Sequence, residues 1–126
     1  MAVSRIRVLC VDDNHDIADS EAMLLDLLGY HSRACYDGLQ ALVEAREFRP
    51  DVFLLDLNMP GMDGCALARE LRTRNSGPRP ILVAVTAKSG HEDVCRTREA
   101  GFDAHFVKPV EPKLLLDMLA KVKSSN

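Results

Sequence analysis

The chain has 126 residues, of which 47% are hydrophobic and 28% charged, and its formal net charge is −3. This length suits one compact domain, expected over residues 1–126, and leaves no room for a second domain of usual size. The slight acidity argues against direct binding to nucleic acid or to an anionic membrane, and no run approaches the roughly 20 apolar residues of a membrane span, so a cytoplasmic protein is expected.

Short apolar runs of strand length alternate along the chain with apolar residues at helical spacing. The first run, 6–11, is followed by the helical set Ile17, Leu24, Leu25 and Leu28, and then by the set Leu39, Leu42 and Val43. The run 51–55 is followed by Gly64, Leu67, Ala68 and Leu71, and the run 81–85 comes next. The last run, 104–107, precedes Leu115, Met118, Leu119 and Val122.

This alternation predicts an α/β fold with a doubly wound parallel sheet and helices on both faces. Polar residues directly follow the runs: the pair Asp12-Asp13, then Asp56, Thr86 and Lys108. In such sheets ligands bind outside the carboxyl ends of the strands. We therefore expect these five side chains to meet at one edge of the sheet.

The chemistry of this set indicates phosphoryl transfer assisted by a divalent cation. Three crowded carboxylates repel one another unless a cation compensates, and oxygen ligands without nearby Cys or His favour Mg²⁺ or Mn²⁺. With the cation held by Asp13 and Asp56, an Asp56 oxygen is placed to attack phosphorus and form an acyl phosphate. Lys108 and the Thr86 hydroxyl suit the phosphoryl oxygens.

Two further expectations concern backbone donors and thiols. The backbone N–H groups of Leu57 and Ala87 are expected to add donors to the phosphoryl site. The four cysteines are widely spaced and lack the C-x-x-C arrangement of redox or zinc sites, so they are interpreted as buried, reduced thiols. They are Cys10, Cys35, Cys65 and Cys95.

These segments resemble the receiver domain of two-component response regulators. The resemblance rests on Val11-Asp12-Asp13, on residues 54–64 (LLDLNMPGMDG), on Val85-Thr86-Ala87 and on Val107-Lys108-Pro109. It extends over residues 5–122 and implies a single receiver domain with a flavodoxin-like, five-stranded fold in the strand order 2-1-3-4-5. It also implies a cis bond before Pro109, which an X-Pro bond adopts at low cost.

The resemblance implies a role for each site residue. Asp56 accepts a phosphoryl group from a phosphohistidine on a sensor histidine kinase or a histidine phosphotransfer domain. Asp13 and Asp56, with the backbone carbonyl of Asn58, coordinate Mg²⁺, and Asp12 acts through bound water. Lys108 pairs with the phosphoryl group.

The resemblance also implies a switch, in which Thr86 moves toward the phosphoryl group and the side chain three residues before Lys108 swings inward. That side chain is His105, where the family most often has Tyr or Phe, and a histidine can carry charge near neutral pH. Asn58 and Lys88 lie two residues after Asp56 and Thr86, and we hypothesise that they tune the lifetime of the acyl phosphate. Unaltered decay rates in their alanine variants would contradict this.

Several alternatives remain open at this point. The preferred interpretation is a signalling switch that catalyses only its own phosphorylation and dephosphorylation, as a monomer or weak dimer, with a separate output partner or an effector domain outside the chain. A stand-alone regulator, a shuttle in a phosphorelay and a receiver module excised from a hybrid histidine kinase all remain open. A Mg²⁺-dependent aspartyl-phosphate phosphohydrolase is disfavoured because Asp56-Leu57-Asn58 lacks a second acid, and an FMN protein because Asp12-Asp13 would repel the FMN phosphate.

Overall fold

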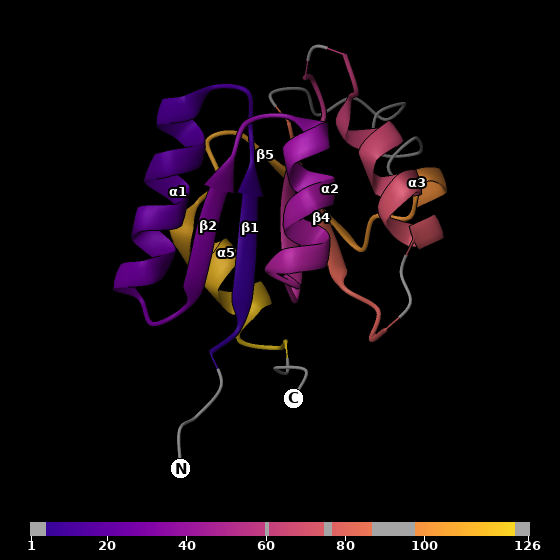
Figure 1. The fold of residues 1–126 in the computed structure, drawn as a ribbon. Coiled ribbons are helices and arrows are strands. Elements are labelled where there is room, and N and C mark those ends of the chain that lie inside the picture. Colours follow the sequence, from indigo (N-terminus) through magenta and orange to yellow (C-terminus); the bar gives the residue numbers. More distant parts are fainter. Residues whose placement is uncertain (1–4, 60, 75–76, 87–97, 123–126) are drawn as a thin grey trace.

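The computed structural model describes residues 5–59, 61–74, 77–86 and 98–122, which form a five-stranded parallel sheet with helices on both faces (Figure 1). The elements in chain order are β1 (Arg7–Val11), α1 (His15–Leu27), β2 (His31–Cys35), α2 (Gly38–Glu47), β3 (Val52–Asp56), α3 (Gly64–Arg74), β4 (Ile81–Thr86), β5 (Ala104–Val107) and α5 (Pro112–Leu119). The strand order is β2-β1-β3-β4-β5. This confirms the predicted α/β fold and its strand order.

The strand register aligns the ends that carry the candidate site. Val11 at the end of β1 pairs with Cys35 of β2 and with Leu55 of β3, and Thr86 at the end of β4 pairs with Val107 of β5. Because all four strand pairs are parallel, the polar residues that follow β1 and β5, or that end β3 and β4, lie at the same end of the strands. The strand order reverses between β1 and β3, where ligands of such sheets bind.

Strand residues alternate between two apolar layers, one on each face of the sheet. The layer under α2 and α3 contains Leu9, Val11, Phe53, Leu55, Leu82 and Ala84, with Leu42, Leu67 and Leu71 from the helices. The layer under α1 and α5 contains Val8, Cys10, Val52, Leu54, Val83 and Val85, with Ala22, Leu25, Leu115 and Leu119 from the helices. All five residues of β3 are buried, as expected for a central strand covered on both faces.

Strand β2 has no apolar run and was implied by the family resemblance alone. Its sequence, His-Ser-Arg-Ala-Cys, buries only Ser32 and Cys35 because it lies at the edge of the sheet. The Ser32 amide and hydroxyl both donate to Asp26 of α1, at 2.9 and 2.8 Å. Arg33 forms an ion pair with Glu44 of α2 at 3.1 Å. Polar contacts with α1 and α2 thus stabilise β2 where other strands rely on runs of apolar side chains.

The predicted inward face of α1 is partly wrong. Leu24 and Leu28 are 37% and 46% exposed, and the residues that face the sheet are Ala18, Ala22 and Leu25. The small alanines allow α1 to pack closely on the sheet. Leu24 and Leu28, which the hydrophobic pattern placed inward, lie instead on a partly exposed side.

Helix α2 departs from its predicted pattern in the same way, whereas α3 and α5 follow theirs. In α2, Leu42 is buried as expected, but Leu39 and Val43 are exposed and Ala41 takes the inward position. Helix α3 buries all of its predicted inward residues, and α5 buries Leu115 and Leu119.

The thiols agree with the sequence interpretation within the described ranges. Cys10, Cys35 and Cys65 are buried and unbonded to one another, and Cys95 lies outside the described residues. Burial raises the pKa of the Cys35 thiol to about 12, which keeps it protonated at neutral pH. Within the same ranges, no helix has the length and hydrophobicity needed to span a bilayer.

Candidate functional site

The end of β1 turns one carboxylate inward and leaves the next exposed. Asp12 is almost fully buried, its backbone N–H donates to Cys35 O at 3.2 Å, and its Oδ1 accepts from Asn14 N at 3.0 Å. Asp13 is exposed. Asn14 caps α1 through a bond from Ile17 N to its side chain, so the helix starts directly beyond the acidic pair.

Asp56 ends the central strand and is only 5% exposed. Its Oδ1 accepts from the backbone N–H of Asn58 at 3.2 Å. The Leu57 N–H donates to Val85 O at 3.2 Å, which corrects the expectation that it is a spare donor for a phosphoryl group. The other expected donor, Ala87 N–H, lies outside the described residues.

The three carboxylates form one cluster with the composition of a magnesium site. Asp12, Asp13 and Asp56 each offer an oxygen, and these oxygens lie within 4.8 Å of one another. Burial raises the pKa of Asp56, the Asn58 amide lowers it, and the negative charge of Asp12 raises it again, with a net increase. An additional cation would relieve this unfavourable charge, so the residues fit Mg²⁺ or Mn²⁺.

Lys108 supplies the positive charge within the cluster. It follows β5, and its Nζ lies 2.7 Å from Asp12 Oδ2 and 3.6 Å from Asp56 Oδ1. Burial acts to lower its pKa, but the Asp12 hydrogen bond and the Asp56 charge outweigh burial, and the pKa is raised. Lys108 is therefore cationic at neutral pH. The bond to Pro109 is cis, as expected.

Thr86 is 1% exposed at the end of β4. Its Oγ1 accepts from Asn58 Nδ2 at 3.4 Å, so the hydroxyl and a neighbour of the phosphoacceptor candidate are already in contact. The geometry thus brings together Asp12, Asp13, Asp56, Thr86 and Lys108. Asn58 joins them.

The two remaining predicted residues are less closely tied to the cluster. His105 is half-buried on β5 opposite Ala84, on the same face of the sheet as Thr86. Its Nε2 is buried and has no hydrogen-bond partner among the described residues. Lys88, the other predicted tuning residue, lies outside the described ranges.

Sequence reasoning missed a further carboxylate, Glu21. It is half-buried on the helical face of α1 that carries Ala18, Ala22 and Leu25. Burial raises its pKa to about 7, the charges of Asp12 and Asp56 act in the same direction, and Lys108 opposes them. An acid between apolar residues at i−3 (Ala18) and i+4 (Leu25) was the available sequence signal.

Replacing Glu21 with Gln is expected to stabilise the metal-free protein by about 1–3 kcal/mol at pH 8. The folded protein holds a proton on Glu21 up to about pH 7, whereas an unfolded Glu loses it near pH 4.5, so the wild type loses stability as pH rises between these values. The gain should vanish below pH 4.5. Urea unfolding across this range measures it, and an equal gain at every pH would contradict the assignment.

Comparisons with known proteins agree with this geometry. The family model of the response regulator receiver domain matches residues 8–120. The chain is 38% identical over 124 residues to the DNA-binding response regulator MtrA of Mycobacterium tuberculosis, covering 98% of this chain and 52% of that protein. It is 38% identical over 122 residues to the transcriptional regulatory protein PrrA of Mycobacterium leprae, covering 97% and 50%. The chain spans about half the length of these curated relatives.

Solved structures show the same fold along nearly the whole chain. The chemotaxis protein CheY4 of Vibrio cholerae superimposes with a TM-score of 0.88 at 29% identity, covering 95% of this chain and all of that one (100%). The CheY-like receiver domain protein of Methanospirillum hungatei gives 0.83 at 28% identity, covering 94% and 93%. The BeF3-activated receiver domain of Klebsiella pneumoniae RstA gives 0.81 at 25% identity, covering 90% and 95%.

Proposed function

The chain belongs to the response regulator receiver domain family, and on that basis we propose that Asp56 accepts a phosphoryl group in a Mg²⁺-dependent reaction. The donor is a phosphohistidine of a sensor histidine kinase or a histidine phosphotransfer domain. The observation that carries the proposal is the cluster of Asp12, Asp13 and Asp56 within 4.8 Å, with the Lys108 ammonium 3.6 Å from the Asp56 carboxylate.

In the proposed step an Asp56 oxygen bonds to phosphorus while the phosphorus–nitrogen bond of the donor breaks. The imidazole nitrogen keeps the electron pair and takes a proton from solvent. Lys108 and the Thr86 hydroxyl stabilise the negative charge on the transferred oxygens. Asp13, Asp56 and the Asn58 carbonyl would hold Mg²⁺, with Asp12 acting through water, and the ion would offset the charge of the carboxylates and the phosphoryl group.

Phosphorylation then acts as a ligand that favours one of two conformations. The phosphoryl oxygens attract the Thr86 hydroxyl away from Asn58, and His105 follows on the same face of the sheet. We propose that the protein acts as a switch and turns over no separate substrate. A phosphohydrolase would need a second acid after Asp56, where the chain has Asn58.

The output lies outside the residues that carry this site. MtrA is named as a DNA-binding response regulator, and this chain matches about half of it. We propose that this receiver controls either an effector segment joined to it or a separate partner, and that it does so as a monomer or weak dimer. A receiver module of a hybrid histidine kinase is the second candidate. We also propose that the protein works in the cytoplasm.

Intact-protein mass spectrometry after incubation with acetyl phosphate tests the proposed function. We expect a gain of one phosphoryl group with Mg²⁺, no gain with EDTA, and no gain in Asp56→Asn. Asp37→Asn is the matched control, because Asp37 caps α2 and Asn caps equally well. Absence of any gain in the wild type would refute the mechanism.

Replacing His105 with Phe is expected to increase the fraction of phosphorylated protein in the active conformation. His105 Nε2 is buried without a hydrogen-bond partner among the described residues, and a buried polar atom without a partner is costly, so an apolar ring should take the inward position more readily. The measurement is the fraction of protein in the active conformation, followed by NMR with saturating acetyl phosphate. The same fraction in both proteins would remove the hypothesis.

A further inference from the structure

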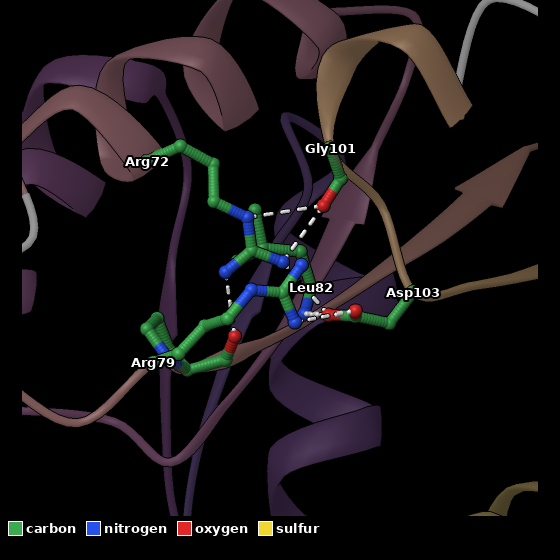
Figure 2. A network of polar contacts seen from close by, with 6 residues as sticks. Arg72, Arg79, Leu82, Gly101 and Asp103 are labelled. Carbon is green, nitrogen blue, oxygen red and sulfur yellow. Dashed lines mark hydrogen bonds and ion pairs between the residues drawn. The ribbon is translucent and has the colours of Figure 1, made fainter.

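Arg72, in the last turn of α3, binds backbone carbonyls at the end of the sheet opposite to the phosphoacceptor site. Arg72 donates from Nη1 to Pro80 O at 2.7 Å, and from Nε and Nη2 to Gly101 O at 3.1 and 2.7 Å (Figure 2). Its Nη2 also pairs with Asp103 Oδ2 at 2.8 Å. One side chain thereby joins the residue before β4 to the loop before β5.

Asp103 completes this junction. Its Oδ2 accepts from Leu82 N at 2.9 Å, its own N–H donates to Leu82 O at 2.7 Å, and its Oδ1 accepts from Arg79 at 2.8 Å (Figure 2). Burial acts to raise the pKa of Asp103, but the bonds from Leu82, Arg79 and Arg72 outweigh burial and lower it. The carboxylate is therefore ionised and fully engaged. Arg72 and Asp103 are hereafter called the clamp.

The clamp lies next to β5, a short strand at the edge of the sheet. Strand β5 has four residues, none of them fully buried, and pairs on one side only, with β4. Because none of its side chains is fully buried, burial specifies the register of β5 only weakly, and a slip of one residue would turn every side chain to the other face. Asp103 directly precedes β5, and the clamp fixes it against Leu82 of β4.

The far end of the same strand carries the catalytic lysine. Lys108 directly follows β5, five residues after Asp103, or about 16 Å along an extended strand. Its backbone N–H donates to Thr86 O at 2.7 Å, and its Nζ reaches Asp12 and Asp56. The register at the start of β5 and the Lys108–Thr86 bond at its end therefore determine together where Lys108 lies along the sheet.

We propose that Arg72 and Asp103 are positioning residues for the phosphoryl-transfer reaction, which fix the register of β5 on β4 and so hold Lys108 at the Asp56 carboxylate. The inference rests on the proposed function of Asp56 and Lys108. The charge network that would do this lies at the end of the sheet farthest from Asp56.

The test is a double-mutant cycle on the rate of Asp56 phosphorylation by acetyl phosphate. Arg72→Met keeps most of the aliphatic stem and removes the guanidinium. A misplacement of 1 Å can cost up to about 100-fold, and the flexible lysine absorbs part of it, so we expect labelling about five- to tenfold slower. In a Lys108→Met background the same change should slow labelling less than about twofold, because the residue being positioned is gone.

Arg33→Met provides the matched control. Arg33 forms an ion pair with Glu44 of α2 at 3.1 Å on β2, the other edge strand, which carries no predicted site residue. It should leave labelling within about twofold of the wild type. Rates are measured well below the unfolding midpoint of each variant, and Asp103→Asn serves as a second clamp variant if Arg72→Met does not fold.

Each outcome has a defined meaning. Equal slowing by the clamp variants with and without Lys108, or unchanged labelling in folded clamp variants, would overturn the positioning role and leave the proposed function intact. Labelling that is insensitive to Lys108→Met would remove the residue being positioned and overturn this inference alone. A wild type that acetyl phosphate does not label would refute the proposed function itself and this inference with it.

Discussion

Replacing Gly64 with Ala is expected to lower the free energy of unfolding by about 1–3 kcal/mol and to slow phosphorylation of Asp56 by about tenfold. A Cβ on Gly64 would lie 2.5 Å from Asp56 O and 2.9 Å from Leu57 Cα. Both atoms belong to the backbone, and Leu57 is hydrogen-bonded to Val85 O of β4, so they cannot move aside cheaply. The added methyl group must displace either α3 or Asp56.

The start of α3 has no freedom to retreat from this clash. Gly64 N donates to Leu57 O at 3.2 Å, and the Asp63 side chain caps the helix through Ala66 N at 2.8 Å. Urea unfolding and acetyl phosphate labelling measure the two effects. Gly77→Ala is the control, because a Cβ there meets nothing within 4 Å. Equal stability of the two variants would show that the contact between α3 and Asp56 is not rigid.

Much of the candidate site was predictable because parallel strands end at one edge of a sheet. The position of a polar residue directly after an apolar run can be predicted without knowing how side chains pack. Asp12, Asp13, Asp56 and Lys108 do lie together. The donor assigned to Leu57 was wrong, because the hydrogen bond to β4 continues one residue beyond the end of β3. Strand ends are the least certain feature of a sequence pattern.

Edge and surface elements were harder to predict for a physical reason. Strand β2 is stabilised by bonds from Ser32 to Asp26 and by the Arg33–Glu44 ion pair, and neither interaction leaves a hydrophobic period in the sequence. Helix α1 packs through Ala18 and Ala22, whose small size favours close contact but adds little to a hydrophobic pattern. Glu21 was overlooked for the related reason that a charged residue is normally assigned to solvent.

Replacing Lys108 with Met is expected to slow phosphorylation of Asp56 by about 100-fold or more. The Lys108 ammonium is the cation closest to the Asp56 carboxylate among the described residues, at 3.6 Å, and it is bonded to Asp12 at 2.7 Å. Methionine keeps most of the side-chain volume, so the loss reports the charge and not a cavity. Intact-protein mass spectrometry with acetyl phosphate and Mg²⁺ gives the rate.

The same substitution should shift the pH dependence of labelling upward. Burial raises the pKa of Asp56 and Lys108 lowers it, so removing the lysine raises the pKa further and leaves less of the nucleophilic carboxylate at a given pH. Labelling of Lys108→Met should therefore recover partly as pH increases, until the carboxylate is fully ionised. The remaining deficit measures stabilisation of the transferred oxygens.

Lys113→Met separates this role from the general loss of a positive charge. Lys113 is exposed in the first turn of α5. Its replacement changes the net charge by the same amount as Lys108→Met, so labelling should stay within about twofold of the wild type. If Lys108→Met labelled as fast as Lys113→Met at every pH, the ammonium would not act on the reacting group. The Asp12–Lys108 pair would then be a structural ion pair that joins β1 to β5, and the chemistry would rest on Asp56 and the bound cation alone.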